Sequence, residues 1–263
     1  MPRTILTYHP ARMESLTRAG CDLLALEADL ALLAARGIPV VSLGDILSPD
    51  CEHGVAITFD DGARMDAESY VHPRHGALPS ALDILRRFGQ RLPRLKVASF
   101  VIASPAARMG IQATLTAEYG PELLHQRWWG DAQHSGLMQI ENHSWDHNHP
   151  VLARSVQRDN VRGRFDVIET EAEAEAEIAR ASDYIAAQTG MRPVYFAYPF
   201  GQTNDFLATD YLPRRGAAIG LRAAFTTDPR PLNDDDSRWL LPRYVCGRDW
   251  CDDLGLERLI TAP

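Results

Sequence analysis

The sequence predicts an α/β fold built on a mostly parallel sheet, and two observations lead to this prediction. Short apolar runs rich in β-branched residues alternate along the chain with segments that have helical spacing. Glycine and proline separate these segments, and no tandem repeat interrupts the alternation. Such a rhythm is typical of parallel strands joined by helices, in a sheet that is open or closed into a barrel.

The elements follow in order from local patterns. A first helix is predicted where leucines recur at helical spacing from Leu23 to Leu33, with Gly37 as its end. A second helix spans Pro79–Phe88, and a long third helix spans Glu169–Thr189, where alanine and glutamate favour helix. Apolar runs predict strands at Thr4–Tyr8, Pro39–Val41, Val55–Phe59, Val97–Ile102, Leu137–Ile140, Val194–Ala197, Ala223–Thr226 and Leu240–Val245.

Length and composition favour one domain that spans residues 1–263. The hydrophobic fraction of 45% is ordinary for a globular protein, and no Gly/Ser-rich linker divides the chain. Arg64–Pro79 carries prolines, histidines and a glycine, which predicts an irregular insertion. The polar segment Arg154–Thr170 is expected to be a surface excursion.

Charge and cysteine content exclude several classes of partner. The net charge of −8 argues against a nucleic-acid binder and against a polybasic membrane-surface protein. Leu23–Ala35 is too short to cross a bilayer, and the N-terminus lacks the features of a signal peptide. We therefore expect a cytoplasmic protein, unless a leader has been removed, with reduced cysteines at positions 21, 51, 246 and 251.

Polar side chains gather where four of the expected strands end. Functional sites collect at the carboxyl ends of parallel strands, so these side chains are the candidates for a site. They are His9, the pair Asp60 and Asp61, the group His143, His147 and His149, and the turn Tyr198–Gly201.

The adjacent aspartates and the spaced histidines are together consistent with a metal site. Two ionised carboxylates side by side repel, and a cation would explain them, although a turn whose first aspartate caps a helix is an equal alternative. His143 and His147 share one face if they lie on a helical turn, although nine histidines make such a pair possible by chance. Combined, Asp61, His143 and His147 suit a divalent ion with open positions for water and substrate.

Five segments of the chain resemble motifs of one family. Thr58–Gly62 (TFDDG) and His143–His147 (HSWDH) resemble the first two motifs of the polysaccharide deacetylases, the NodB-homology carbohydrate esterases. Ala197–Gly201 (AYPFG) is similar to the third motif. Leu6–His9 and Leu241–Arg243 resemble the branch that includes poly-N-acetylglucosamine deacetylases, so that the resemblance covers nearly the whole chain.

The resemblance implies a distorted (β/α) barrel and one divalent metal ion, with zinc the first choice. It implies that Asp61, His143 and His147 bind the metal and that Asp60 acts as the general base. The backbone N–H of Phe200 would stabilise the oxyanion. His149 is a nearby imidazole that could replace His147 as a ligand or line the site.

The chain departs from the family pattern at two positions. Ala197 stands where the third motif usually has an arginine that orients the catalytic aspartate, and Arg243 is the candidate to replace it. No histidine follows His149, so the customary catalytic acid has no counterpart. We expect His9 to take that role, the alternative being that His9 is a buried structural imidazole.

Trp145 lies inside the second motif and is the aromatic residue most suited to contact a sugar; Tyr8 and Tyr198 also flank the site in sequence. The expected function is a metal-dependent hydrolase of carbon–nitrogen bonds outside peptides, which removes acetyl groups from N-acetylated or O-acetylated sugars. The alternatives are hydrolysis of a small non-sugar amide or cyclic imide, and a catalytically weak carbohydrate-binding homologue.

Overall fold

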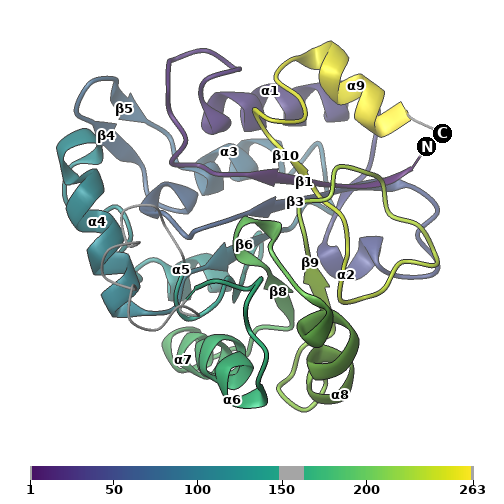
Figure 1. Cartoon of the computed structure of the whole chain (residues 1–263). Coiled ribbons are helices and arrows are strands. Elements are labelled where there is room, and N and C mark those ends of the chain that lie inside the picture. The colour runs from purple at the N-terminus through teal and green to yellow at the C-terminus, as the bar shows by residue number, and fades with distance from the viewer. Residues whose placement is uncertain (1, 148–162, 262–263) are drawn as a thin grey trace.

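A curled parallel sheet forms the centre of the molecule (Figure 1). The computed structural model describes residues 2–147 and 163–261. The eight strands of the sheet are β1 (Arg3–Tyr8), β2 (Val40–Val41), β3 (Gly54–Phe59), β6 (Val97–Val101), β7 (Met138–Asn142), β8 (Tyr195–Ala197), β9 (Ala223–Phe225) and β10 (Tyr244–Val245). They run in the order β10-β1-β3-β6-β7-β8-β9, with β2 paired to β3.

The two ends of this strand order meet through one short segment. Leu241 forms a parallel bridge with Phe225 of β9, and a few residues later Tyr244 pairs with Leu6 of β1. The stretch from Leu241 to Val245 therefore contacts both β9 and β1. This geometry confirms the expected α/β fold, a distorted (β/α) barrel with fewer regular units than the eightfold form.

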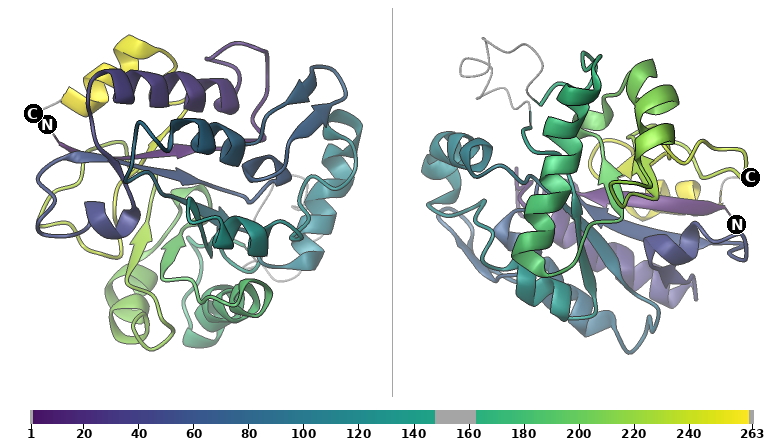
Figure 2. Two further views of the ribbon diagram at one scale, coloured as in Figure 1. Left: turned by 180° about the vertical axis from the view of Figure 1, so that it is seen from behind. Right: turned by 90° about the horizontal axis from the view of Figure 1, so that it is seen from below.

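The three predicted helices are present and cover the outside of the sheet (Figure 2). They are α1 (Asp22–Ala35), α3 (Ala81–Phe88), and the run of α6 (Glu171–Ala174), a π-helical stretch (Glu175–Ala179) and α7 (Arg180–Thr189). Ser80 caps α3 and Thr170 caps α6, each with a reciprocal bond to the acidic residue three positions later. Gly190, with φ of 74°, ends the long run.

Several elements escaped the sequence patterns. The predicted insertion Arg64–Pro79 is not irregular, since it contains a 3₁₀ turn and a hairpin of β4 (Tyr70–His72) and β5 (Gly76–Leu78). His72 of this hairpin is buried, and its ring packs against that of Tyr119. Weak periodicity or short length hid α2 (Leu43–Ile46), α4 (Pro105–Tyr119), α5 (Trp129–His134), α8 (Leu212–Arg215) and α9 (Asp253–Thr261).

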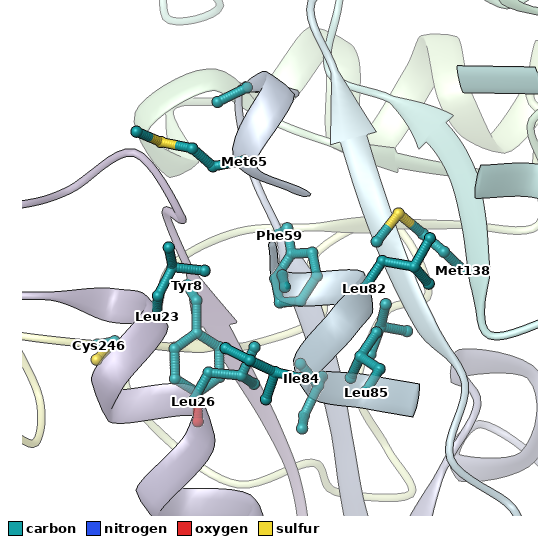
Figure 3. Close-up of a cluster of buried hydrophobic side chains, with 14 of the residues drawn as sticks. Tyr8, Leu23, Leu26, Phe59, Met65, Leu82, Ile84, Leu85, Met138 and Cys246 are labelled. Carbon is teal, nitrogen blue, oxygen red and sulfur yellow. The ribbon is translucent and has the colours of Figure 1, made fainter. Parts of the chain in front are cut away.

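The largest apolar cluster lies between α1, α3 and the sheet (Figure 3). The cluster contains Leu23 and Leu26 of α1, Phe59 of β3 and the apolar face of α3. Tyr8 points into the same cluster and its hydroxyl donates to Asp29, so it does not flank the site as expected. Among the described residues, no helix has the length and apolar character needed to cross a membrane.

Candidate active site

Three of the predicted metal ligands come together at the carboxyl ends of the strands. Asp61 follows β3, and His143 and His147 follow β7. Their ligand atoms all lie within 4.8 Å of one another. His143 and His147 are buried, whereas the side chain of Asp61 is 39% exposed, so the group opens to solvent on the carboxylate side.

The backbone is strained at these motifs. Asp61 (φ 75°), Ser144 (φ 73°) and Phe200 (φ 56°) have positive φ values, which non-glycine residues rarely adopt. Each lies in one of the three family-like motifs, and among the described residues Glu122 is the one other such case. Strain of this kind concentrates where side chains are aimed for a task, which supports a functional role for all three turns.

Gly62 shows why the first turn needs its sequence. Its φ is 74°, and a Cβ there would lie 2.7 Å from the side chain of Val101 on β6. Only glycine lets the chain turn this closely against the neighbouring strand. The turn thereby directs Asp60 and Asp61 from the end of β3 towards the site.

The imidazole of His143 is oriented by the third motif. Its Nδ1 lies 2.9 Å from the carbonyl oxygen of Ala197, to which it can donate a hydrogen bond. That bond leaves Nε2 facing Asp61. Metal-binding histidines commonly donate their second nitrogen to a carbonyl in this way, which sets the tautomer.

The spacing of these groups fits a divalent ion. Nε2 of His143 lies 3.6 Å from Oδ1 of Asp61, and Nε2 of His147 lies 3.7 Å from the same oxygen. These distances are too long for hydrogen bonds. Two ligands of a tetrahedral zinc ion, each with a bond of about 2.1 Å, would lie about 3.4 Å apart. Two imidazoles and one carboxylate are also a donor set that suits zinc.

Asp60 does not belong to the group of candidate metal ligands; its carboxylate is held by Arg243. Two parallel hydrogen bonds of 2.8 Å join the guanidinium to the two carboxylate oxygens. Arg243 is fully buried and donates further to Thr58 Oγ1 and to the carbonyl oxygen of Thr226. Burial would raise the pKa of Asp60, but the charge of Arg243, aided by those of His143 and His9, lowers it to about 2.

The position of Arg243 agrees with its predicted orienting contact. Ala197 cannot supply the usual arginine, and Arg243 reaches Asp60 from the segment that closes the barrel between β9 and β10. The two residues are 183 positions apart. Thr58 also accepts a hydrogen bond from Arg243 and so supports the ion pair of Arg243 with Asp60. Its position two residues before Asp60 is the sequence signal that could have indicated this role of Thr58.

His9 lies on the same rim as the aspartates. Tyr8 pairs with Phe59 in register, and the N–H of Asp60 donates to the carbonyl oxygen of Tyr8, so His9 follows at the level of Asp60. It is half-buried, and its charge contributes to the lowering of the pKa of Asp61, against the opposing effect of burial. His9 is thus close to the site and not under the barrel floor.

The remaining predicted site residues separate in space. Phe200 is 52% exposed, and its ring lies 4.7 Å from that of His147, so it borders the site. Tyr198 is fully buried and its hydroxyl donates to the carbonyl oxygen of Trp239, which leaves it no surface for a substrate and corrects the prediction. His149 lies outside the described residues.

Trp145 lies beside the three candidate metal ligands and does not cover them. It is half-buried, and the guanidinium of Arg180 lies 3.8 Å from the centre of its ring. With Ser104 and Met109 it lines a pocket in which none of the three metal-ligating candidates takes part. The expected contact between Trp145 and a substrate would therefore concern parts of the ligand away from the reacting group.

One buried carboxylate near the site was not predicted. Asp66 is fully buried and accepts a hydrogen bond of 2.6 Å from Ser99 Oγ, while its Oδ1 has no partner among the residues described. Burial, with smaller contributions from the charges of Asp61 and Asp60, raises its pKa well above the usual value. The sequence did not single out Asp66, because it lies in Arg64–Pro79, which was predicted to be an irregular insertion.

Comparisons with known proteins agree with this geometry. The family model described as polysaccharide deacetylase matches residues 48–212. None of the curated proteins matches the chain significantly in sequence.

Three solved structures share its fold. Deacetylase PplD of Streptococcus pyogenes, in complex with acetate, is 15% identical, with 99% of each chain covered and a TM-score of 0.64. IcaB of Ammonifex degensii is 17% identical, with 93% of this chain and 91% of that chain covered and a TM-score of 0.60. A polysaccharide deacetylase of Bacillus cereus is 16% identical with a TM-score of 0.61; the match covers 94% of this chain but only 65% of that one.

Proposed function

The chain belongs to the polysaccharide deacetylase family, and from this premise we propose that it is a metal-dependent hydrolase that removes acetyl groups from N-acetylated sugars or oligosaccharides. The observation that carries the proposal is the division of labour between adjacent aspartates. Asp61 faces two imidazole nitrogens, and Asp60 is held by Arg243. A carboxylate for a metal and a carboxylate for a proton are what metal-assisted hydrolysis requires.

Asp61, His143 and His147 would hold the ion, and zinc is the metal that their donor atoms favour. A zinc ion supplies Lewis-acid chemistry, which polarises a carbonyl group and lowers the pKa of water. The exposed side of Asp61 leaves room for water and for an acetyl group to approach. The hydrogen bond to the carbonyl of Ala197 would orient His143 as a ligand.

Asp60 is the proposed general base. Its low pKa keeps it ionised at neutral pH, so it is ready to accept a proton from the attacking water. Arg243 engages both carboxylate oxygens, each of which retains a second lone pair for that proton. The arginine thereby holds the base in one orientation.

His9 and Phe200 complete the proposed chemistry. His9 is at the level of Asp60 on the same rim and would donate a proton to the amine as it leaves. The N–H of Phe200, in the strained turn after β8, would stabilise the charge that develops on the acetyl oxygen. The exposed Phe200 ring would border the sugar beside His147.

The test measures acetate release by the zinc-loaded protein. We expect turnover of N-acetylglucosamine oligomers, none after the metal is removed with a chelator, and recovery when zinc is restored. Faster hydrolysis of small amides or cyclic imides than of these oligomers would move the substrate outside sugars. Sugar binding without acetate release would instead indicate a carbohydrate-binding homologue.

The ligand assignment has a separate measurement. Elemental analysis should find about one divalent ion per chain, and His143→Ala should lose it, because a site with two protein ligands binds zinc weakly. Full metal occupancy in that variant would contradict the assignment of His143.

A further inference from the structure

The buried carboxylate of Asp22 contacts the backbone of His9, the proposed catalytic acid. Asp22 is the first residue of α1 and is 1% exposed. Its Oδ2 accepts the backbone N–H of His9 at 2.6 Å, and its Oδ1 accepts Nε of Arg12 at 2.7 Å. A buried carboxylate thus holds the main chain of His9 with a charge-assisted hydrogen bond.

Backbone hydrogen bonds complete the turn that follows β1. The N–H of Arg12 donates to the carbonyl oxygen of His9 at 2.7 Å, and the N–H of Asp22 donates to that of Arg12 at 3.2 Å. Gly247, with φ of 80°, gives the Arg12 side chain its space, since a Cβ there would lie 2.6 Å from the guanidinium carbon. His9 is therefore fixed at its own N–H and C=O.

This fixation matters because His9 sits where a strand becomes a loop. A free loop would let the imidazole sample many positions, whereas proton transfer needs a nearly fixed distance to the leaving group. We propose that Asp22 is a positioning residue for the reaction: it anchors the backbone of His9 and so sets the imidazole at the level of Asp60. The proposal rests on the proposed function, in which His9 donates the proton.

Asp29 provides a matched control in the same helix. It is fully buried and accepts hydrogen bonds from the hydroxyl of Tyr8 at 2.7 Å and from Nε1 of Trp250 at 2.8 Å, and it also pairs with Arg18. It holds the side chain of Tyr8 in the core, and none of its hydrogen bonds to described residues goes to His9. A purely structural effect should be equal or larger for Asp29→Asn than for Asp22→Asn.

The experiment compares zinc-loaded Asp22→Asn, Asp29→Asn and His9→Ala, and the double variant of Asp22 and His9. Each is assayed on N-acetylglucosamine oligomers, whose amine needs a proton to leave, and on 4-nitrophenyl acetate, whose leaving group does not. We expect Asp22→Asn to lower kcat on the oligomers about tenfold, with KM and nitrophenyl acetate hydrolysis within twofold of the parent. In the His9→Ala background the same substitution should have no further effect.

The outcomes distinguish the positioning role of Asp22 from the proposed acid role of His9. Equal losses on both substrates, losses that add to those of His9→Ala, or a matching loss in Asp29→Asn would overturn the positioning role. A slow His9→Ala with a normal Asp22→Asn would overturn it too and leave the function intact. A normal His9→Ala would refute the acid role of His9 and this inference with it, even where acetate release continues.

A second variant covers the case in which Asp22→Asn does not fold. Arg12→Gln removes one arm of the same turn from a side chain that is 22% exposed. It should lower kcat on the oligomers about threefold with the same dependence on the leaving group. An equal loss on nitrophenyl acetate would contradict the proposal.

Discussion

Two buried aspartates, six residues apart, have opposite surroundings. Asp60 meets the guanidinium of Arg243 through two hydrogen bonds and has a pKa of about 2. Asp66 meets only the hydroxyl of Ser99 among the described residues, and burial raises its pKa well above the usual value. Burial is the largest single influence on both, and it acts in the same direction.

The difference between Asp60 and Asp66 shows that a buried carboxylate stays ionised where a cation lies against it. Desolvation penalises an ionised carboxylate, and at Asp60 the charge and the hydrogen bonds of Arg243 outweigh that penalty. Asp60 is therefore an ionised base at neutral pH, whereas Asp66 retains its proton to a higher pH. Asp60 belongs to the candidate site, and Asp66 lies near it in the 3₁₀ turn Arg64–Asp66.

The largest expected effect follows from removal of the cation. Arg243→Met should leave Asp60 buried without a partner and lower the free energy of unfolding by roughly 3–5 kcal/mol. Adding Asp60→Asn to this variant should restore part of the loss, because the uncompensated charge at position 60 is then absent. Urea denaturation of the metal-free proteins measures both; a loss under 1 kcal/mol would show that the pair is not what keeps the charge.

Loss of the base should have the next largest effect. Asp60→Asn should lower acetate release by roughly a hundredfold or more while the metal stays bound, since the proton acceptor is gone. Asp66→Asn is the matched control and should keep activity within a few-fold. If Asp60→Asn empties the metal site and Asp61→Asn does not, the two aspartates have exchanged roles.

The pH dependence of stability tests the low pKa of Asp60 directly. Its pKa is about 2 in the folded state against 3.8 as the ordinary value, so its contribution is present above pH 4 and is lost as pH falls towards 2. That contribution is about 2 kcal/mol. Unfolding curves of the metal-free parent and of Asp60→Asn should converge by this amount between pH 4 and pH 2, and parallel curves would count against it.

The smallest effect has the opposite sign. The raised pKa of Asp66 stabilises the fold below pH 3.8, and this benefit is lost as pH rises above that value. Asp66→Asn should therefore raise the free energy of unfolding at pH 7, on the order of 1 kcal/mol, with a gain that shrinks towards pH 4. A variant less stable than the parent at pH 7 would mean that the carboxylate has a partner it needs.

The sequence by itself was sufficient for what depends on neighbours along the chain. The apolar runs predicted the strands of the sheet, and the residues that follow them, Asp61, His143 and His147, came together because parallel strands end at one rim. The capping pairs of α3 and α6 and the glycine that ends α7 are equally local. Local patterns predict these features because their energies depend on a few adjacent residues.

Only the tertiary structure decided which side chains face the site. Tyr198 and Phe200 are two positions apart, yet one is fully buried and the other half exposed, and Phe200 adopts the strained φ of 56° in the turn that follows Tyr198. Arg243 meets Asp60 across 183 positions because the barrel closes through the segment that carries it. Asp66 lies in a segment that the sequence predicted to be irregular, and only the folded structure shows that it is buried against Ser99. Such contacts arise from closure of the sheet and from burial, and no spacing within the sequence encodes either.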